Sequence, residues 1–264
     1  AALPGQPHWL DVAGRRIRYV RQGEGADAVV MVHGFGGRLE NWALNQGALA
    51  DGRTVVALDL PGHGESSLDV GTGSLDELAT IVLAFLDALG IDRAQLVGHS
   101  MGAALGLLLA DRVPQRVQSL ALVGPAGTGQ KISADFIRGF IGAREPDQIA
   151  SLLRMLYADP RRVTDALVAS VVMYKRREGV VEALTKIASS RYGGTPSGRS
   201  LREVMGSVST LVIWGLEDAV IPPPPPGEFK DAGVEMHVLP GCGHMVQEEA
   251  ADEVKRLIDD FLRR

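Results

Sequence analysis

The sequence is poor in cysteine, in aromatic residues and in long uncharged hydrophobic runs. One cysteine, Cys242, stands among its 264 residues, which excludes an internal disulfide and fits a reducing compartment. No apolar run approaches the length that crosses a membrane, and residues 1–7 lack the features of a signal peptide. Lysine and arginine number 27 against 32 acidic residues, with no basic run. We therefore expect a cytoplasmic protein with neither a nucleic-acid nor a membrane partner.

The chain has instead the length and the apolar content of one α/β domain, at 45% hydrophobic residues. Short apolar runs at 29–32 and 54–58 alternate with helical patterns, which predicts a mostly parallel sheet flanked by helices. Residues 16–21 alternate with a period of two and predict a half-exposed antiparallel edge strand. Ser74 followed by Glu77 predicts a helix that begins with a capping box.

The alternation of strands and helices breaks within residues 127–207, which hold helical patterns and no convincing strand. Because this stretch follows the sixth major strand, we predict a helical cap over the carboxyl edge of the sheet. A second helical layer without contact to the site is the alternative. The core then comprises residues 1–126 and 208–264, and it ends in an amphipathic helix over 246–262.

One five-residue motif, at 98–102, carries most of the functional information. It reads Gly-His-Ser-Met-Gly and fits the G-x-S-x-G nucleophile elbow, with an apolar strand at 94–97 before it and a buried helix at 103–110 after it. A turn this sharp needs glycine on both sides of the serine, where a Cβ would collide with the backbone. We predict that Ser100 is a nucleophile.

A serine hydroxyl needs a base to accept its proton during attack. His244 lies in the glycine-rich loop 241–245, which opens at the same sheet edge as Ser100, and imidazole suits proton transfer at neutral pH. Asp218 follows the preceding strand and would orient the imidazole, with the adjacent Glu217 as its rival. The predicted triad is Ser100, Asp218 and His244, in the chain order expected for the elbow.

The oxyanion of such a reaction needs two fixed N–H donors. We predict the backbone N–H of Met101 and that of Phe35, which lies in the glycine-rich loop 33–37. We expect His99 to point away from the serine, and Cys242 to be either a packed small residue or a reactive thiol. The sequence has no metal-ligand spacing and does not identify substrate-binding residues.

These motifs together resemble the α/β-hydrolase family over nearly the whole chain. The motifs that carry the resemblance lie at 33–37, 59–66, 98–102, 214–218 and 243–244. Within that family the chain is similar to the acetyltransferase components of bacterial acetoin dehydrogenase complexes. This second resemblance depends on residues 34–37, 40–42, 157–160, 174–176 and 243–247.

The resemblance implies an acyl-enzyme on Ser100 and no bound cofactor. That family joins a lipoyl domain to a hydrolase-fold domain and passes acetyl from dihydrolipoamide to coenzyme A, so either thiol is an expected co-substrate of a small acyl substrate. Other subunits of a dehydrogenase complex are then expected partners. No lysine lies in an N-terminal lipoyl pattern, so either that domain has been removed or the chain is free-standing. The alternatives are a carboxylesterase or thioesterase, a carbon–carbon bond hydrolase of aromatic degradation, and a non-catalytic scaffold domain.

Overall fold

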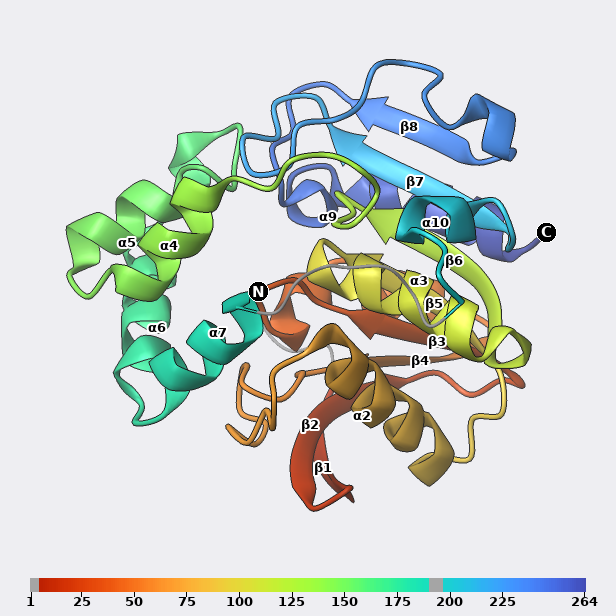
Figure 1. Cartoon of the computed structure of the whole chain (residues 1–264), viewed down its shortest axis with the longest axis horizontal. Coiled ribbons are helices and arrows are strands. Elements are labelled where there is room, and N and C mark those ends of the chain that lie inside the picture. The colour runs from red at the N-terminus through yellow and green to blue at the C-terminus, as the bar shows by residue number, and fades with distance from the viewer. Residues whose placement is uncertain (1–4, 190–196) are drawn as a thin grey trace.

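The computed structural model describes residues 5–189 and 197–264 (Figure 1). Residues 1–4, part of the stretch without signal-peptide features, lie outside the described residues, as do residues 190–196 of the predicted cap. The eight strands are β1 (Pro7–Val12), β2 (Arg15–Gln22), β3 (Asp27–Val32), β4 (Arg53–Leu58), β5 (Ala94–His99), β6 (Val117–Val123), β7 (Thr210–Gly215) and β8 (Glu235–Leu239). They form one sheet in the order β1-β2-β4-β3-β5-β6-β7-β8. β2 runs antiparallel to both of its neighbours, β1 and β4, and all other neighbouring strands are parallel.

Helices cover both faces of this sheet. The α-helices are α1 (Gln46–Leu49), α2 (Leu75–Ala88), α3 (Met101–Arg112), α4 (Ala134–Gly142), α5 (Pro146–Leu153), α6 (Asp165–Arg176), α7 (Val180–Ser189), α8 (Leu201–Met205), α9 (Val246–Glu249) and α10 (Ala251–Leu262). Short 3₁₀ turns lie at η1 (Leu39–Trp42), η2 (Pro114–Arg116), η3 (Pro160–Arg162) and η4 (Lys230–Ala232). Val30 and Val32 of β3 pack into the cluster that contains α2 and α3, whereas Val29 and Met31 pack into the cluster that contains α10. Burial on both faces explains why the central strands are continuous apolar runs.

The predicted edge strand is not at the edge. β2 matches its position but lies between β4 and β1, which pairs with it residue by residue from Pro7 opposite Val20 to Val12 opposite Arg15. The expected antiparallel direction is present, but the edge position was wrong because β1 adds a further strand along the outer side of β2. Arg18 is 4% exposed and donates to Asp59 inside the protein.

Two helices differ in detail from the sequence prediction. The first begins directly after Ser74, as predicted. Ser74 caps α2 by accepting from the backbone N–H of Glu77, but the Glu77 carboxylate accepts from Thr72 and Arg15, so no reciprocal capping box forms. The predicted terminal helix is broken into α9 and α10 at Ala250, whose φ of −120° and ψ of 46° are not helical.

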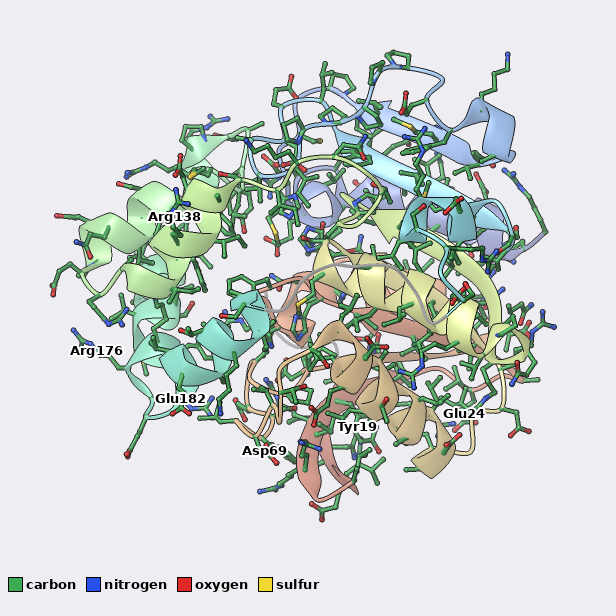
Figure 2. The ribbon with its side chains drawn as sticks, in the orientation of Figure 1. Tyr19, Glu24, Asp69, Arg138, Arg176 and Glu182 are labelled. Carbon is green, nitrogen blue, oxygen red and sulfur yellow. The ribbon has the colours of Figure 1, made fainter. Side chains whose placement is uncertain are left out.

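The described part of the segment between β6 and β7 consists of helices joined by loops and contains no strand. Figure 1 shows α4 to α7 gathered at one end of the sheet, and Figure 2 shows Arg138, Arg176 and Glu182 pointing outward from them. In contrast, α8 packs on α3, with Leu201 and Val204 in the main hydrophobic cluster. The division into a core and a cap stays a prediction. Of the helices in the described ranges, none is long and apolar enough to cross a bilayer.

Candidate active site

The turn between β5 and α3 holds Ser100 in a conformation that L-residues rarely adopt, with φ +53° and ψ −113°. The residues two positions before and two positions after Ser100 must be glycine for steric reasons. A Cβ on Gly98 would lie 2.5 Å from the carbonyl oxygen of Gly102, and a Cβ on Gly102 would lie 2.2 Å from that of Val32. The backbone N–H of Ser100 donates to the carbonyl oxygen of Val123 at 2.9 Å. This packing fixes the serine where β5 ends.

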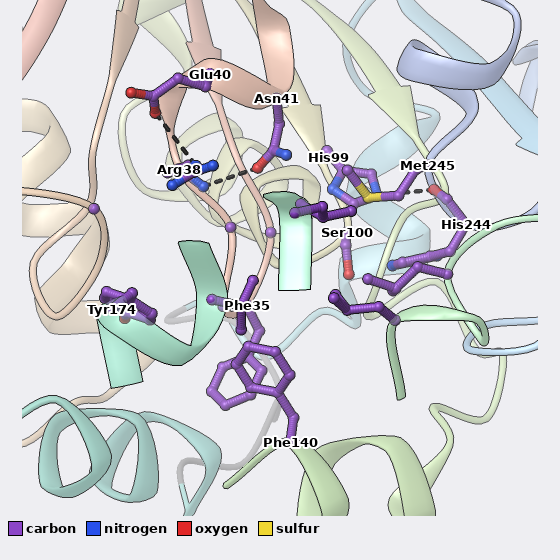
Figure 3. A pocket seen from close by; sticks show the side chains of 18 of the residues that line it. Phe35, Arg38, Glu40, Asn41, His99, Ser100, Phe140, Tyr174, His244 and Met245 are labelled. Atoms are coloured by element: carbon purple, nitrogen blue, oxygen red, sulfur yellow. Dashed lines mark hydrogen bonds and ion pairs between the residues drawn. The ribbon is translucent and has the colours of Figure 1, made fainter. Parts of the chain in front are cut away.

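The loop after β8 places His244 against Asp218. The imidazole Nδ1 lies 2.7 Å from Asp218 Oδ2, and both side chains are buried. The other oxygen, Oδ1, accepts from the backbone N–H groups of Val220 and Ile221, each at 2.8 Å. Because a carboxylate only accepts, the neutral imidazole in this position has its proton on Nδ1 and its lone pair on Nε2. Figure 3 shows the imidazole pointing toward the Ser100 hydroxyl.

The two neighbouring acids after β7 have different partners. Glu217 accepts from the backbone N–H of Cys242 at 3.1 Å and donates its own N–H to the Cys242 carbonyl oxygen at 3.0 Å. Asp218 is therefore the acid that bonds His244. Burial, together with the nearby charges of Glu249 and Glu217, raises the pKa of the Cys242 thiol to about 11. A thiol protonated at neutral pH argues for packing rather than reactivity.

The two predicted oxyanion donors have no acceptor in the described part of the chain. Met101 is the first residue of α3, so its N–H has no intrahelical acceptor. Phe35 lies in the loop after β3, which His33 fixes by accepting from the Leu60 N–H at 3.0 Å. A Cβ on Gly34 would lie 2.9 Å from Ser100 Cβ, so this loop passes directly beside the serine. Both N–H groups therefore remain the predicted oxyanion donors.

His99 is among the residues that line the cavity in front of Ser100. Its Nε2–H donates to the backbone carbonyl oxygen of His244 at 3.0 Å, and the two ring centres are 4.6 Å apart. Burial, with the charge of His244 second, lowers its pKa well below the usual value, so it is neutral at pH 7.

A cavity of about 410 Å³ opens in front of Ser100 and His244 (Figure 3). Part of its wall is apolar and includes Phe35, Ile132, Phe136, Ile137, Phe140, Leu153, Leu156, Val171, Val220 and Met245. Another part is polar and includes Arg18, Arg38, Glu40, Asn41, Glu65, Ser170, Tyr174 and Arg177. The sequence identified no substrate-binding residues because the residues that line the cavity come from segments far apart in the chain, from Arg18 to Met245. Within the described ranges, no three His, Cys, Asp or Glu side chains are grouped to hold a metal ion.

Arg38, on the polar part of the wall, has hydrogen-bond donors that its own partners do not use. Its side chain is 38% exposed, and its Nη2 donates to Ser170 Oγ at 3.3 Å. Its Nε lies 3.6 Å from Glu40, whose other oxygen already accepts from Arg18 at 2.9 Å. Since a guanidinium has five N–H donors, several stay available to a polar ligand.

Comparisons with known proteins identify the family and the fold. The family model described as "alpha/beta hydrolase fold" matches residues 27–251. The chain is 44% identical over 259 residues, 98% of its length and 70% of the relative's, to the dihydrolipoyllysine-residue acetyltransferase component of an acetoin cleaving system from Pseudomonas putida. It is 33% identical over 271 residues, 94% of its length and 90% of the relative's, to a 2-hydroxy-6-oxononadienedioate/2-hydroxy-6-oxononatrienedioate hydrolase from Paraburkholderia xenovorans.

Solved structures give the same fold. A meta-cleavage product hydrolase from Pseudomonas fluorescens IP01 superposes with a TM-score of 0.83 at 26% identity, over 97% of each chain. The sheet order, the helical layers and the sequence comparison all indicate an α/β-hydrolase fold. The chain belongs to the α/β-hydrolase family and is similar over nearly its whole length to the acetyltransferase component of acetoin cleaving systems.

Proposed function

We propose that this chain is a serine-dependent acyl-transfer enzyme with the triad Ser100, His244 and Asp218. The observation that carries the proposal is the 2.7 Å bond between Asp218 Oδ2 and the buried His244 Nδ1, beside a serine held at positive φ on the same cavity. A base, its orienting acid and a nucleophile thus face one space large enough for a substrate.

In the proposed reaction, Ser100 Oγ attacks the carbonyl carbon of an acyl ester or thioester while His244 Nε2 accepts its proton. Asp218 stabilises the imidazolium, and the N–H groups of Phe35 and Met101 bind the developing oxyanion. Each such donor contributes about 2.7–4 kcal/mol to the transition state. The imidazolium then protonates the leaving thiol or alcohol, which leaves an acyl group on the serine.

The acyl-serine next reacts with water or with a second thiol, and we propose the thiol. Similarity to the acetoin-system acetyltransferase component supports acetyl transfer from dihydrolipoamide to coenzyme A. In this proposal neither thiol is a resident cofactor, and both enter as co-substrates. The available donors of Arg38 suit the polar part of such an acceptor. Other subunits of an acetoin cleaving system are the proposed partners.

A carbon–carbon bond hydrolase is the second candidate. The cavity of about 410 Å³ exceeds what a two-carbon acetyl group fills, and its wall includes three phenylalanines, Phe35, Phe136 and Phe140. Such a wall suits a longer conjugated substrate, and a relative at 33% identity is named for one.

The test incubates the protein with p-nitrophenyl acetate, with and without coenzyme A or dihydrolipoamide, and identifies the acyl product by mass spectrometry. We expect acyl-thiol as the main product and at least a 10³-fold loss of turnover in Ser100→Ala. Ser151→Ala is the matched control, because Ser151 is exposed on α5 and bonds only within its helix.

The products distinguish the alternatives. Free acid alone indicates an esterase or thioesterase, and turnover that survives in Ser100→Ala removes the proposed nucleophile. Wild-type protein that turns over no acyl ester, but cleaves a meta-cleavage product, supports the second candidate. Turnover of neither substrate class indicates a non-catalytic domain.

A further inference from the structure

The single-turn helix α9, directly after the His244 loop, carries two adjacent glutamates. The carboxylate of Glu249 accepts three backbone N–H groups from two segments. Its Oε2 lies 2.6 Å from the Gly243 nitrogen, and its Oε1 lies 2.9 Å and 3.1 Å from the nitrogens of Ala158 and Asp159. One side chain thus joins the loop that bears His244 to the connection between α5 and α6.

The backbones of these two segments are already in close contact. The Met245 N–H donates to the Leu156 carbonyl oxygen at 3.0 Å. A Cβ added to Gly243 would lie 2.8 Å from both the Ala158 nitrogen and the Leu156 carbonyl oxygen. Leu156 and Met245 both line the cavity in front of Ser100. The junction is therefore part of the cavity wall beside the proposed base.

Glu248 makes the matching connection to the other side of the site. Its Oε2 accepts from the Tyr157 hydroxyl and its Oε1 from Asn41 Nδ2, each at 2.8 Å. Asn41 Oδ1 in turn accepts from the Arg38 N–H at 2.8 Å, three residues beyond Phe35. Desolvation raises the pKa of Glu248, although both of these hydrogen bonds oppose that shift.

We propose that Glu249 is a positioning residue that sets the placement of His244 relative to Ser100, by holding the base loop against the segment 156–159. Glu248 makes the equivalent connection from that segment to the oxyanion loop. This inference rests on the proposed function, in which His244 is the base. A displacement of 1 Å at a reacting group can cost about a hundredfold in rate, so a loosened loop has a measurable effect.

A carboxylate is the side chain that suits this junction. Its two oxygens accept on both sides, whereas Glu249→Gln keeps one acceptor oxygen and turns an NH₂ group toward an N–H donor. The glutamine variant should therefore lose one connection and keep the other. Alanine should lose both, which gives a graded series of variants.

The experiment measures kcat and KM for p-nitrophenyl acetate in wild type, Glu249→Ala and Glu249→Gln, together with amide hydrogen exchange at Gly243, Ala158 and Asp159. We expect kcat to fall 30- to 100-fold in Glu249→Ala and about tenfold in Glu249→Gln, with KM changed less than threefold. The three amides should exchange at least tenfold faster in the alanine variant. The control is Glu253→Ala, on the exposed face of α10, where the side chain pairs only with Arg256.

Faster exchange at the three amides with kcat within twofold of wild type would overturn the proposal, because the contacts would then be structural only. A rise in KM at unchanged kcat would overturn it as well. If the alanine variant does not fold, unchanged kcat in Glu249→Gln has the same meaning. Ser100→Ala is measured alongside, so that turnover surviving there identifies a failure of the proposed function rather than of the positioning role.

Discussion

The replacement Asp218→Asn tests the proposed triad with the least change in shape. The two oxygens of Asp218 have different partners. Oδ1 accepts two backbone N–H groups, from Val220 and Ile221, whereas Oδ2 accepts one N–H from His244. An asparagine in this site should keep its oxygen on the side with two donors. Its NH₂ group then faces His244 Nδ1.

An NH₂ group in that position can only donate, so Nδ1 must accept and the imidazole proton moves to Nε2. A protonated Nε2 cannot take the proton from Ser100. In a triad with this geometry the wrong tautomer lowers kcat by about 10⁴-fold. Stability should fall by only about 1–2 kcal/mol, because the two backbone hydrogen bonds persist and lose only their charge-assisted part.

The assay is kcat for p-nitrophenyl acetate, paired with urea unfolding of each variant. Asp218→Ala should also unfold more easily, by about 2–6 kcal/mol, since it leaves the buried N–H groups of Val220 and Ile221 unpaired. Glu217→Gln is the matched control and should keep wild-type kcat within about threefold. A folded Asp218→Asn variant with kcat within tenfold of wild type would refute the reasoning.

Two further predictions concern pH and the acceptor. Burial lowers the pKa of His63 to about 4, and it lowers the pKa values of His33 and His99 as well. Because folding disfavours the charged imidazole, His63 should lower the free energy of unfolding as the pH falls from about 6.5 to about 4, by about 3 kcal/mol at the lower pH. Burial raises the pKa of Asp59 to about 6, which acts in the opposite direction over the same range, so urea unfolding at about pH 7 and about pH 4 compares wild type with His63→Gln. The same pH dependence in both proteins would contradict the prediction. Arg38→Gln should raise KM for coenzyme A about tenfold and change KM for p-nitrophenyl acetate less than twofold. Steady-state kinetics measure both constants, and equal changes in the two would contradict a role of Arg38 in acceptor binding.

The sequence predicted the fold class and the meeting of the motif residues because their signals are local. The glycines that flank Ser100 have a steric reason that is visible in five residues. His244 and Asp218 follow strands whose carboxyl ends share one sheet edge, so topology alone brings them together. Only the side-chain geometry separates Asp218 from Glu217, which differ in which backbone groups reach them.

The features that the sequence did not predict depend on distant partners. β2 is not an edge strand because β1 pairs with it, and no residue of β2 indicates that pairing in the sequence. Glu249 reads as one more acid in an amphipathic terminal helix. Its donors Ala158 and Asp159 are about ninety residues away, and the break of the helix at Ala250 follows directly after it. A one-dimensional pattern carries no signal for such a junction.

The single cysteine of the chain gives this junction a natural reporter. Cys242 immediately precedes Gly243 in the base loop, and its side chain is 3% exposed with a pKa raised to about 11. In the closed loop the thiol is both shielded and protonated, so modification by a soluble disulfide reagent requires the loop to open. The rate of that modification therefore counts loop openings in the unmutated protein. A bound acyl group or acceptor thiol that closes the site should slow the modification of Cys242. Its rate therefore measures ligand binding without any turnover.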